Sequence, residues 1–215
     1  MTDIDRRFAR VIDNFACEGG FSAPSISTAT IVIVVPRRID LDVVRENETL
    51  QVRTKKGKNY RPFSNSVTIM YDMTKTVKVF TNGKLHITGC TTMAHAESIA
   101  SRFLTSMDWA DTPVTEKKIL TLNTTLHIAP KVAISLGALY ARLATDTSIF
   151  TRYTPDIYQG IIVKKETPDG ARKISILIFY TGSVIVCGVQ RPEELALGLS
   201  VVRSVMEKHL AHVRL

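Results

Sequence analysis

Cysteine is scarce in this chain of 215 residues, and Cys17, Cys90 and Cys187 show no CxxC or metal-type spacing. An odd number of cysteines without a paired pattern argues against a disulfide framework and fits a reducing compartment. The N-terminus is charged and lacks the apolar segment of a secretion signal, and no apolar run approaches the length that crosses a bilayer. We therefore expect a soluble, intracellular protein.

The residue patterns that support catalysis are missing as well. No Ser-His-Asp or P-loop pattern occurs in the sequence. The five histidines lack a helical metal spacing with carboxylates: His86, His95, His127, His209 and His212. We expect no catalytic residues, no metal and no cofactor.

Positive charge is in excess. The formal net charge is +8 with a pI near 9.5, and the residues before Glu116 and those from Glu116 onward are both basic on balance. Such a surplus favours polyanionic partners such as nucleic acid. On charge alone, the alternative is a basic, solvated surface without such a partner.

A hairpin pattern occurs twice. The stretch from Phe80 to Gly89 (FTNGKLHITG) returns as the stretch from Phe179 to Gly188 (FYTGSVIVCG), with the phenylalanine and both glycines at identical spacing. Each copy has the pattern of a strand ending in an aromatic residue, an Asn-Gly or Thr-Gly turn that tolerates positive φ, and a second strand closed by glycine. Each is predicted to be a β-hairpin.

The similarity continues around both hairpins. Tyr60-Arg61-Pro62-Phe63 is echoed by the segment from Tyr153 to Tyr158, and a helical pattern follows each hairpin. We therefore expect an α+β fold made of two repeats, each with a strand, short helices, further strands, the hairpin and a long helix. The expected parts are an N-terminal arm (residues 1–24, with a short helix over 5–15), a first repeat (25–115) and a second repeat (116–215).

Hydrophobic periodicity predicts the individual elements. Strands are expected over residues 27–35, 50–54, 67–71, 76–80 and 118–128, and helices over 40–46, 93–107, 132–143 and from Pro192 onward. Alternation in the first strand places Ala29, Ile31, Ile33 and Val35 on one face and Thr28, Thr30, Val32 and Val34 on the other. A sheet with helices on one side and small uncharged groups on the other presents a surface for a partner.

The first half carries Arg38-Ile39-Asp40-Leu41, Phe63, Phe80, Gly83-Lys84 and Thr88-Gly89, and the second carries the run from Tyr153 to Gly160, then Phe179 and Gly182. With these residues the chain resembles the conserved core of the TATA-box-binding protein family over nearly its whole length after the arm. The resemblance implies two pseudo-symmetric repeats that form a saddle: a curved antiparallel sheet with helices on its convex side. It also implies a function, namely binding the minor groove of double-stranded DNA and bending the duplex.

The resemblance assigns roles to four aromatic residues. Phe63 with Phe80, and Tyr158 with Phe179, would be wedges that open base steps at the two ends of the site. A single aromatic residue at a strand end is typical of a core plug, whereas four at paired positions favour wedges. Opening a step costs a few kcal/mol, and burying a ring returns up to about 4 kcal/mol, so two rings can offset one opened step.

The floor that would face the groove departs from the family. It is expected to contain Thr28, Thr30, His86, Thr88, Thr121, Asn123, Ile185 and Cys187. The family has an asparagine in each half where Thr28 and Thr121 stand here, Asn123 lies two residues away, and Cys187 replaces a threonine. Because the minor groove offers a degenerate pattern of acceptors, losing amide donors should weaken selection of A·T-rich promoters more than it weakens bending.

Basic and acidic side chains around this floor are further candidates. Lys84, Lys164, Lys165, Arg172, Lys173 and the basic turn at residues 55–58 are candidates for phosphate contacts, with solvated charges as the alternative. In the family, acidic positions before the second wedge contact transcription factor B. Of these, Asp156 is retained and Thr154 replaces an acid.

Together these features favour a non-enzymatic general transcription initiation factor that acts with a factor B-like protein and the RNA polymerase machinery. One alternative is a scaffold for transcription proteins with weak or altered DNA specificity. Another is a nucleic-acid repair enzyme, for which we find no second domain to do the chemistry. The departures from the family suggest a relative encoded by a large DNA virus, acting in the nucleus or in a viral factory.

Overall fold

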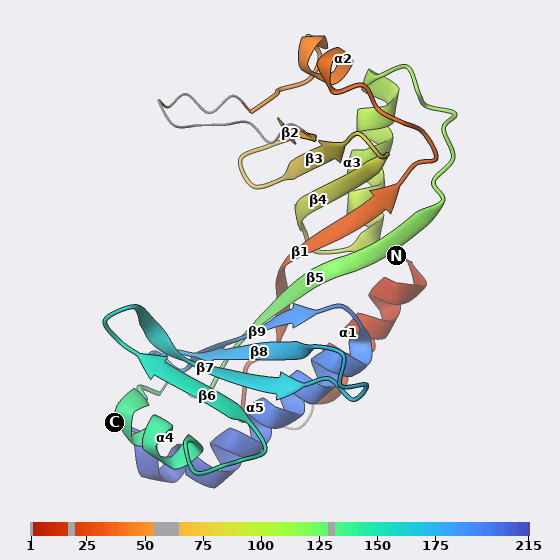
Figure 1. Cartoon of the computed structure of the whole chain (residues 1–215). Coiled ribbons are helices and arrows are strands. Elements are labelled where there is room, and N and C mark those ends of the chain that lie inside the picture. Colours follow the sequence, from red (N-terminus) through yellow and green to blue (C-terminus); the bar gives the residue numbers. More distant parts are fainter. Residues whose placement is uncertain (1, 17–19, 54–64, 129–131) are drawn as a thin grey trace. The chain divides into compact units, whose positions relative to one another are not determined.

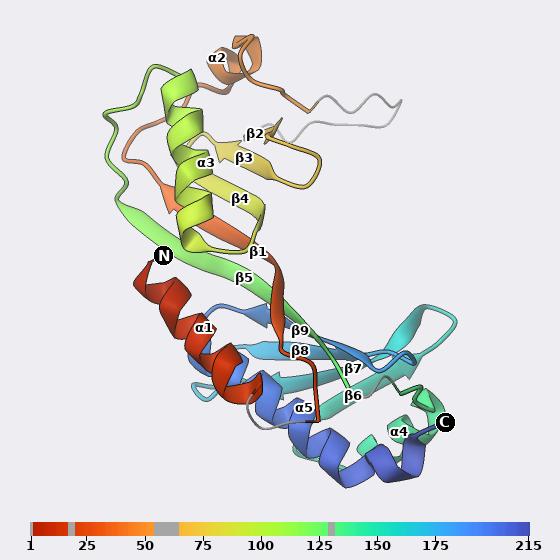
Figure 2. The ribbon, with the colours of Figure 1, turned by 180° about the vertical axis from the view of Figure 1, so that it is seen from behind.

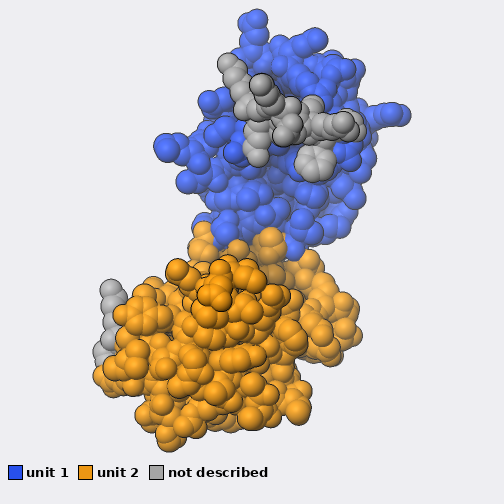
Figure 3. All heavy atoms as spheres, turned by 60° about the vertical axis from the view of Figure 1, so that its left-hand side comes forward, with its two compact units in different colours: residues 1–2, 28–120 blue, residues 3–27, 121–215 orange. Residues whose placement is uncertain are grey.

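Two compact units make up the part of the chain that the computed structural model describes, which is residues 2–16, 20–53, 65–128 and 132–215. Unit 1 comprises the described residues among 1–2 and 28–120, and unit 2 those among 3–27 and 121–215 (Figure 3). Two strands, β1 (Ser25–Val34) and β5 (Glu116–His127), extend from one unit into the other. Each unit is therefore described by its own strands and helices.

Unit 1 has the strand order β2-β3-β4-β1-β5, and α3 covers one side of these strands (Figures 1 and 2). Its remaining elements are α2 (Leu41–Glu46), β2 (Ser66–Met70), β3 (Thr76–Phe80), β4 (Lys84–Cys90) and α3 (Met93–Ser106). The pairings β2–β3, β3–β4 and β4–β1 are antiparallel. Side chains alternate along each strand, so one side of β3 and β4 packs against α3 while the other faces away from it.

The sequence explains where the unit 1 helices begin and what they bury. The Asp40 side chain accepts a hydrogen bond from the Asp42 backbone N–H at the start of α2, and the Thr92 hydroxyl accepts one from the His95 N–H at the start of α3. The apolar stripe of α3 is buried at its expected positions: Ala96, Ile99, Ala100 and Phe103, with Met107 as the C-cap. Both predicted helices are confirmed.

Unit 2 has the strand order β5-β9-β8-β7-β6, and its long helix α5 covers one side of the strands (Figure 2). Its elements are α1 (Asp3–Ala16), α4 (Leu136–Leu143), β6 (Phe150–Thr154), β7 (Tyr158–Glu166), β8 (Lys173–Ile178), β9 (Ser183–Val189) and α5 (Pro192–Val213). Leu195, Leu199, Val202 and Met206, the predicted apolar face of α5, are all buried. The strand pairings are again antiparallel.

The two predicted hairpin turns require glycine. Gly83 has φ +81° and Gly182 has φ +75°, values that residues with a side chain rarely adopt. A Cβ at Gly83 would lie 2.2 Å from the carbonyl oxygen of Val35, and one at Gly182 would lie 2.6 Å from that of Val132. Each glycine therefore allows the turn, and its missing side chain leaves room for the segment that connects the preceding strand to a helix.

The N-terminal arm contains α1, which packs against α5. Phe8 is 1% exposed and Phe15 7% exposed, so both rings are removed from water. The guanidinium of Arg7 pairs with Glu193 at 2.5 Å, and the guanidinium of Arg203 donates to the carbonyl oxygen of Phe15 at 3.2 Å. The arm is thus part of the core of unit 2, a role that its amphipathic sequence alone did not assign.

Three sequence-based expectations need correction. The predicted strand at 50–54 is absent in the described residues 50–53, where Val52 forms a single isolated bridge to Ile69. The helix predicted from Val132 begins at Leu136, because Ile134 instead pairs with Arg214. Val32 lies on the face predicted to be open, yet it is only 2% exposed.

An ion-pair network joins the loop between β7 and β8 to the start of α5. Glu194 is 0% exposed and receives hydrogen bonds from the guanidinium groups of Arg172 and Arg191 and from the backbone N–H of Gln190. Arg191 also pairs with Asp169. A buried carboxylate is stable only with such partners, so this network fixes the loop to the helix.

No helix within the described ranges is long and apolar enough to span a membrane. Those same residues contain no group of three or more His, Cys, Asp or Glu side chains arranged to hold a metal ion.

Candidate nucleic-acid interface

Each unit presents one side of its strands that no helix covers, which we call its open face. In unit 1 it is the side away from α3, and in unit 2 the side away from α5 (Figures 1 and 2). The sequence-predicted site residues on the described strands fall largely on these two faces, because they occupy alternate positions. The faces are described separately below.

The open face of unit 1 carries polar and basic side chains. On β4, Leu85 and Ile87 are fully buried on the helix side, so Lys84, His86 and Thr88 lie on the open face. The hydroxyls of Thr30 and Thr88 are 3.1 Å apart and share a hydrogen bond across β1 and β4. Thr28 is half-buried at the edge of this unit. All five are predicted floor or phosphate-contact residues.

His86 lies within a basic cluster that the sequence prediction recognised only in part. Lys78 on β3 pairs in register with His86. Burial, followed by the positive charges of Lys78, Lys84 and Lys118, lowers the pKa of His86 below its usual 6.5. At neutral pH the imidazole is therefore mainly uncharged, and the positive charges of the three lysines favour that form. We call Lys78, Lys84, His86 and Lys118 the basic cluster.

Phe80 ends β3 on this same face. Its ring lies 4.6 Å from the imidazole of His86, centroid to centroid, and the ammonium of Lys78 lies 5.8 Å from its centroid. The side chain is half-buried. Its predicted partner, Phe63, and the basic turn at 55–58 lie outside the described residues.

The open face of unit 2 is mainly apolar. Thr125, Ile185, Leu177 and Ile162 pair in register across β5, β9, β8 and β7 and form one continuous row. Cys187 pairs with Ser175 in the next row, and burial raises the pKa of its thiol to about 11, so the thiol is neutral. The predicted floor residues Thr121 and Asn123 alternate with the buried Leu122 and Thr124 on β5 and so lie on this face.

Two aromatic rings meet at the end of this face. The centroids of Tyr158 and Phe179 are 6.0 Å apart and the rings are oriented edge to face. A Cβ at Gly160 would lie 3.0 Å from Cε1 of Tyr158 and 3.1 Å from Cε1 of Phe179, so the missing side chain makes room for both rings. Burial, with a smaller contribution from Cys187, raises the pKa of the Tyr158 hydroxyl. Both side chains are half-buried.

Phe179 also borders a hollow on unit 2. This groove has a volume of ≈ 600 Å³ and is lined by Leu136, Tyr153, Pro155, Gln159, Phe179, Tyr180, Thr181 and Ser183. The ring of Phe179 is therefore not enclosed on every side by its own fold. An aromatic ring held at a strand end with one side accessible has the geometry that insertion into a base step requires.

The predicted phosphate contacts in unit 2 do not form one group. Lys164 and Lys173 alternate with buried residues and lie on the open face, where Lys173 pairs with Glu166 at 3.2 Å. Lys165 lies on the opposite side and donates to the carbonyl oxygen of Ser148 at 3.0 Å. Arg172 is held by Glu194 and the carbonyl of Gly188, so its guanidinium is engaged within the fold.

The turn between β6 and β7 projects polar and apolar side chains into solvent. Asp156 is exposed, and its neighbour Ile157 is 77% exposed. The turn is closed by a hydrogen bond from the Ile157 N–H to the carbonyl oxygen of Thr154. An exposed carboxylate next to an exposed large apolar residue is the composition of a small protein-docking site.

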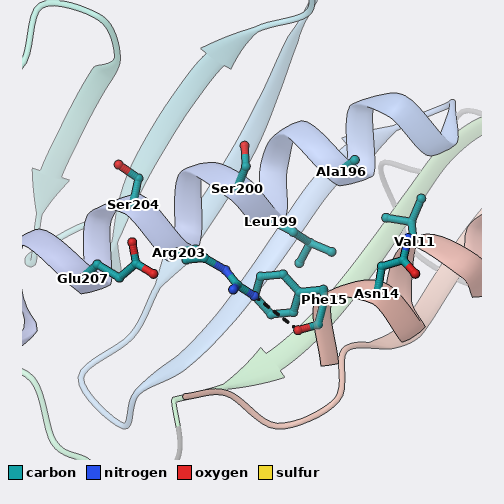
Figure 4. A pocket seen from close by; sticks show the side chains of 9 residues that line it. All are labelled: Val11, Asn14, Phe15, Ala196, Leu199, Ser200, Arg203, Ser204 and Glu207. Atoms are coloured by element: carbon teal, nitrogen blue, oxygen red, sulfur yellow. Dashed lines mark hydrogen bonds between the residues drawn. The ribbon is translucent and has the colours of Figure 1, made fainter. Parts of the chain in front are cut away.

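A second concave site lies on the helix side of unit 2, between α1 and α5. Its volume is ≈ 300 Å³, and Val11, Asn14, Phe15, Ala196, Leu199, Ser200, Arg203, Ser204 and Glu207 line it (Figure 4). The guanidinium of Arg203 stacks 4.5 Å above the centroid of the Phe15 ring. This cavity results from the docking of the arm and does not border the open face residues.

Sequence reasoning missed several residues of the open faces, among them Lys78, Lys118, Leu177 and Ile162. The alternation rule contained the signal for two of them, since Lys78 and Leu177 stand two positions before Phe80 and Phe179. The position of Lys118 depended on which strand β5 pairs with, and that is a tertiary property. The charge of the unit 1 face was underestimated for this reason.

Comparison with known proteins defines the class to which this fold belongs. Residues 123–209 match the family model described as transcription factor TFIID, or TATA-binding protein. The TATA-box-binding protein of Methanothermococcus thermolithotrophicus is 22% identical over 192 residues, which cover 86% of this chain and 96% of that protein. TATA-box-binding protein 2 of Methanosarcina mazei is 24% identical over 130 residues, covering 60% of this chain and 67% of that protein.

Among solved structures, the TATA-binding protein of Methanococcus jannaschii is similar over 86% of this chain and 98% of its own, with a TM-score of 0.63 and 18% identity. The chain therefore has the α+β fold of the TATA-binding protein, an antiparallel sheet with helices. In sequence, residues 123–209, which include the motif around Phe179, resemble the TATA-binding protein family, and the similarity to one archaeal member extends over 86% of the chain.

Proposed function

We propose that this chain is a DNA-binding transcription initiation factor that places the open faces of both units in the minor groove of a duplex and bends it. The edge-to-face pair of Tyr158 and Phe179 above Gly160 carries the proposal. The relationship to the TATA-box-binding proteins and the half-exposed ring of Phe80 at the matching position of unit 1 support it. In this proposal the two units are repeats of one another.

The aromatic side chains act as wedges. Phe179 with Tyr158 opens one base step, and Phe80 with Phe63 opens the other. Unstacking costs a few kcal/mol per step, and transfer of the exposed half of a ring from water returns about 2 kcal/mol at ~25 cal/mol per Å², so a pair of rings offsets one step. The duplex bends because the minor groove widens where the rings enter.

The floor gives the protein limited base selectivity. Thr28, Thr121 and the neutral thiol of Cys187 offer fewer donors than amide side chains would, while Asn123 retains one amide on β5. Shape and deformability of A·T-rich steps then contribute more than hydrogen bonds to base edges. We propose a preference for A·T-rich duplex that is weaker than a full TATA readout.

Protein partners bind elsewhere. Asp156 with Ile157 on the β6–β7 turn is the proposed contact for a factor B-like protein, through which the RNA polymerase machinery is recruited. The exposure of both side chains supports this assignment. A large DNA virus as the source stays a prediction from the divergence of the sequence.

A bending assay tests the wedges. Fluorescence energy transfer between the ends of a short A·T-rich duplex should show a bend with the unmodified protein and a reduced bend with Phe179→Ala and with Phe80→Ala. Tyr180→Ala is the matched control, because Tyr180 adjoins Phe179 but is 57% exposed and stands in the turn. Unchanged bending in both phenylalanine variants would remove the wedge role.

Measuring duplex affinity over a range of salt concentrations separates this function from that of a scaffold that binds only proteins. Affinity for duplex should fall steeply with rising salt, since Lys and Arg contacts to phosphates release counterions. An unmodified chain that binds no duplex at low salt would leave the scaffold as the better function.

A further inference from the structure

Matching positions of the two hairpins carry different chemistry. Two residues before the hairpin phenylalanine, unit 1 has Lys78 and unit 2 has Leu177. Three residues after the turn glycine, unit 1 has His86 and unit 2 has Ile185. Both pairs lie on the open faces, where Lys78 pairs with His86 and Leu177 pairs with Ile185 in the same register. One cross-strand pair is cationic and its counterpart is apolar.

The basic cluster is a local concentration of positive charge. Lys78, Lys84 and Lys118 come from β3, β4 and β5, and all three act on the imidazole of His86. Lys78 is directly opposite the imidazole across β3 and β4, so protonation of His86 would place two positive charges at opposed positions, which destabilises a sheet. One acidic side chain of this unit, Glu116, offsets part of the positive charge by pairing with Lys118 at 2.7 Å. A cluster with this electrostatic cost fits an anionic ligand.

The phosphates that border a minor groove are such a ligand. The ammonium groups come from β3, β4 and β5, with β1 between the last two, so they spread over the face rather than forming a single point, and duplex phosphates present two lines of negative charge. At the matching hairpin positions unit 2 has no such charges, and its row of Thr125, Ile185, Leu177 and Ile162 suits the apolar walls of sugars and base edges.

We propose that the basic cluster of unit 1 binds duplex phosphates, whereas the open face of unit 2 makes the apolar contacts to the groove. This inference rests on the proposed function and assigns a different part of the binding free energy to each half. Unit 1 supplies most of the salt-dependent, sequence-independent part, and unit 2 supplies most of the part that depends on shape and bending. The two units therefore contact the duplex in different ways, unit 1 mainly through positive charges and unit 2 mainly through apolar side chains.

Salt dependence measures this division. The slope of log K against log of the salt concentration is about −0.9 for each phosphate neutralised on B-DNA. Lys78→Leu with His86→Ile gives unit 1 the residues of unit 2, and Lys78→Gln with Lys118→Gln removes two charges while keeping a polar surface. The first variant should lose about one unit of slope and the second about two, with affinity at low salt falling about tenfold per contact.

A control with equal charge change is available in unit 2. Arg10 is exposed on α1 and Lys208 is exposed on α5, so Arg10→Gln with Lys208→Gln removes two charges away from the open face. The slope should stay that of the unmodified protein. Thermal unfolding of each variant identifies any that fails to fold. If Lys78→Leu with His86→Ile does not fold, the variant Lys78→Gln with Lys118→Gln still tests the inference.

The measurement uses fluorescence anisotropy with an A·T-rich and a random duplex across a range of salt. A reduced slope in the unit 1 variants alone supports the inference. An unchanged slope, or tighter binding by Lys78→Leu with His86→Ile, overturns it and leaves an acidic protein surface as the ligand of the cluster. Bending that persists with an unchanged slope overturns only this inference, whereas absence of any duplex binding overturns the proposed function as well.

Discussion

The ring of Tyr158 meets the ring of Phe179 edge to face with a centroid separation of 6.0 Å, and a methyl group at Gly160 would touch both rings. Within the described part of unit 2, neither ring packs against a third aromatic ring. Their geometry therefore depends on the absence of a side chain at one position of β7.

We predict that Gly160→Ala weakens DNA bending without unfolding the protein. The new Cβ would lie 3.0 and 3.1 Å from the two ring carbons, so the rings must shift by a few tenths of an ångström. Gly137→Ala is the control, since a Cβ at that position would meet no atom within 4 Å and a helical Ala stabilises α4 by about 0.5–1 kcal/mol. Bending by Gly160→Ala equal to that of the unmodified protein would show that the ring pair is not needed.

Glu194→Gln should lower the stability of unit 2. The buried carboxylate holds Arg172 and Arg191, whose side chains are 32% and 51% exposed, so its replacement by an amide weakens charge-assisted hydrogen bonds at a cost of roughly 1.5–3 kcal/mol. Glu207→Gln on the exposed side of α5 provides the comparison and should change the free energy of unfolding little. Urea denaturation at neutral pH measures both, and similar stabilities for the two variants would contradict the network's role.

The same carboxylate sets a pH dependence. Burial opposes ionisation of Glu194, but hydrogen bonds from Arg172, the Gln190 N–H and Arg191 outweigh it and lower the pKa below 4.5. A depressed carboxyl pKa contributes stability that is present above the unfolded-state value and is lost as the pH falls through the folded-state value. Acid unfolding curves should therefore show a loss of stability below about pH 4.5 that is smaller in Glu194→Gln.

Affinity for duplex should rise as the pH falls from 8 to 6. In the free protein, burial and then the charges of Lys78 on β3, Lys84 on β4 and Lys118 on β5 lower the pKa of His86, while Glu116 beside Lys118 adds a negative charge nearby. Phosphates that neutralise these lysines raise that pKa again, so the complex takes up a proton. A rise of one pKa unit corresponds to an increase in affinity of up to about tenfold.

Calorimetry in two buffers of different ionisation enthalpy at pH 6 measures this proton uptake. His86→Gln should abolish it, whereas His95→Gln, at an exposed position of α3, should not. Equal uptake by both variants would place the titrating group elsewhere.

Phe8→Ala should detach or loosen the N-terminal arm. The ring is 1% exposed between α1 and α5, and truncation of a buried phenylalanine costs about 3–5 kcal/mol. Phe150→Ala, at a position that is 54% exposed, is the control. Amide hydrogen exchange along α1 should accelerate in Phe8→Ala alone, and unchanged protection of α1 would show that the arm is held by other contacts.

Short-range rules predicted most of the secondary structure. The period of two in Ala29, Ile31 and Ile33 identified the buried side of β1, and the residues Thr92 and Pro192 marked the starts of α3 and α5. Gly83 and Gly182 identified the two turns, because few other residues adopt their positive φ. These features depend on neighbouring residues in the chain, and so they can be seen in the sequence.

Other features depend on which elements pack together. The sequence predicts a short helix in the arm, but only the fold packs α1, with its buried Phe8, against α5. Arg172 was expected to contact phosphate, and the structure instead pairs it with Glu194, which is 22 residues away in the chain. Distant partners of this kind leave no periodic trace in the sequence.

The sequence by itself determined the two hairpins, the alternating faces of the strands and the resemblance to the TATA-box-binding proteins. Tertiary structure decided that Lys118 joins Lys78 and Lys84 around His86, and that Gly160 seats the rings of Tyr158 and Phe179. The physical reason is that local propensity and hydrophobic period act within a strand or a turn. Charge clusters and ring pairs arise only when strand register brings separate segments side by side.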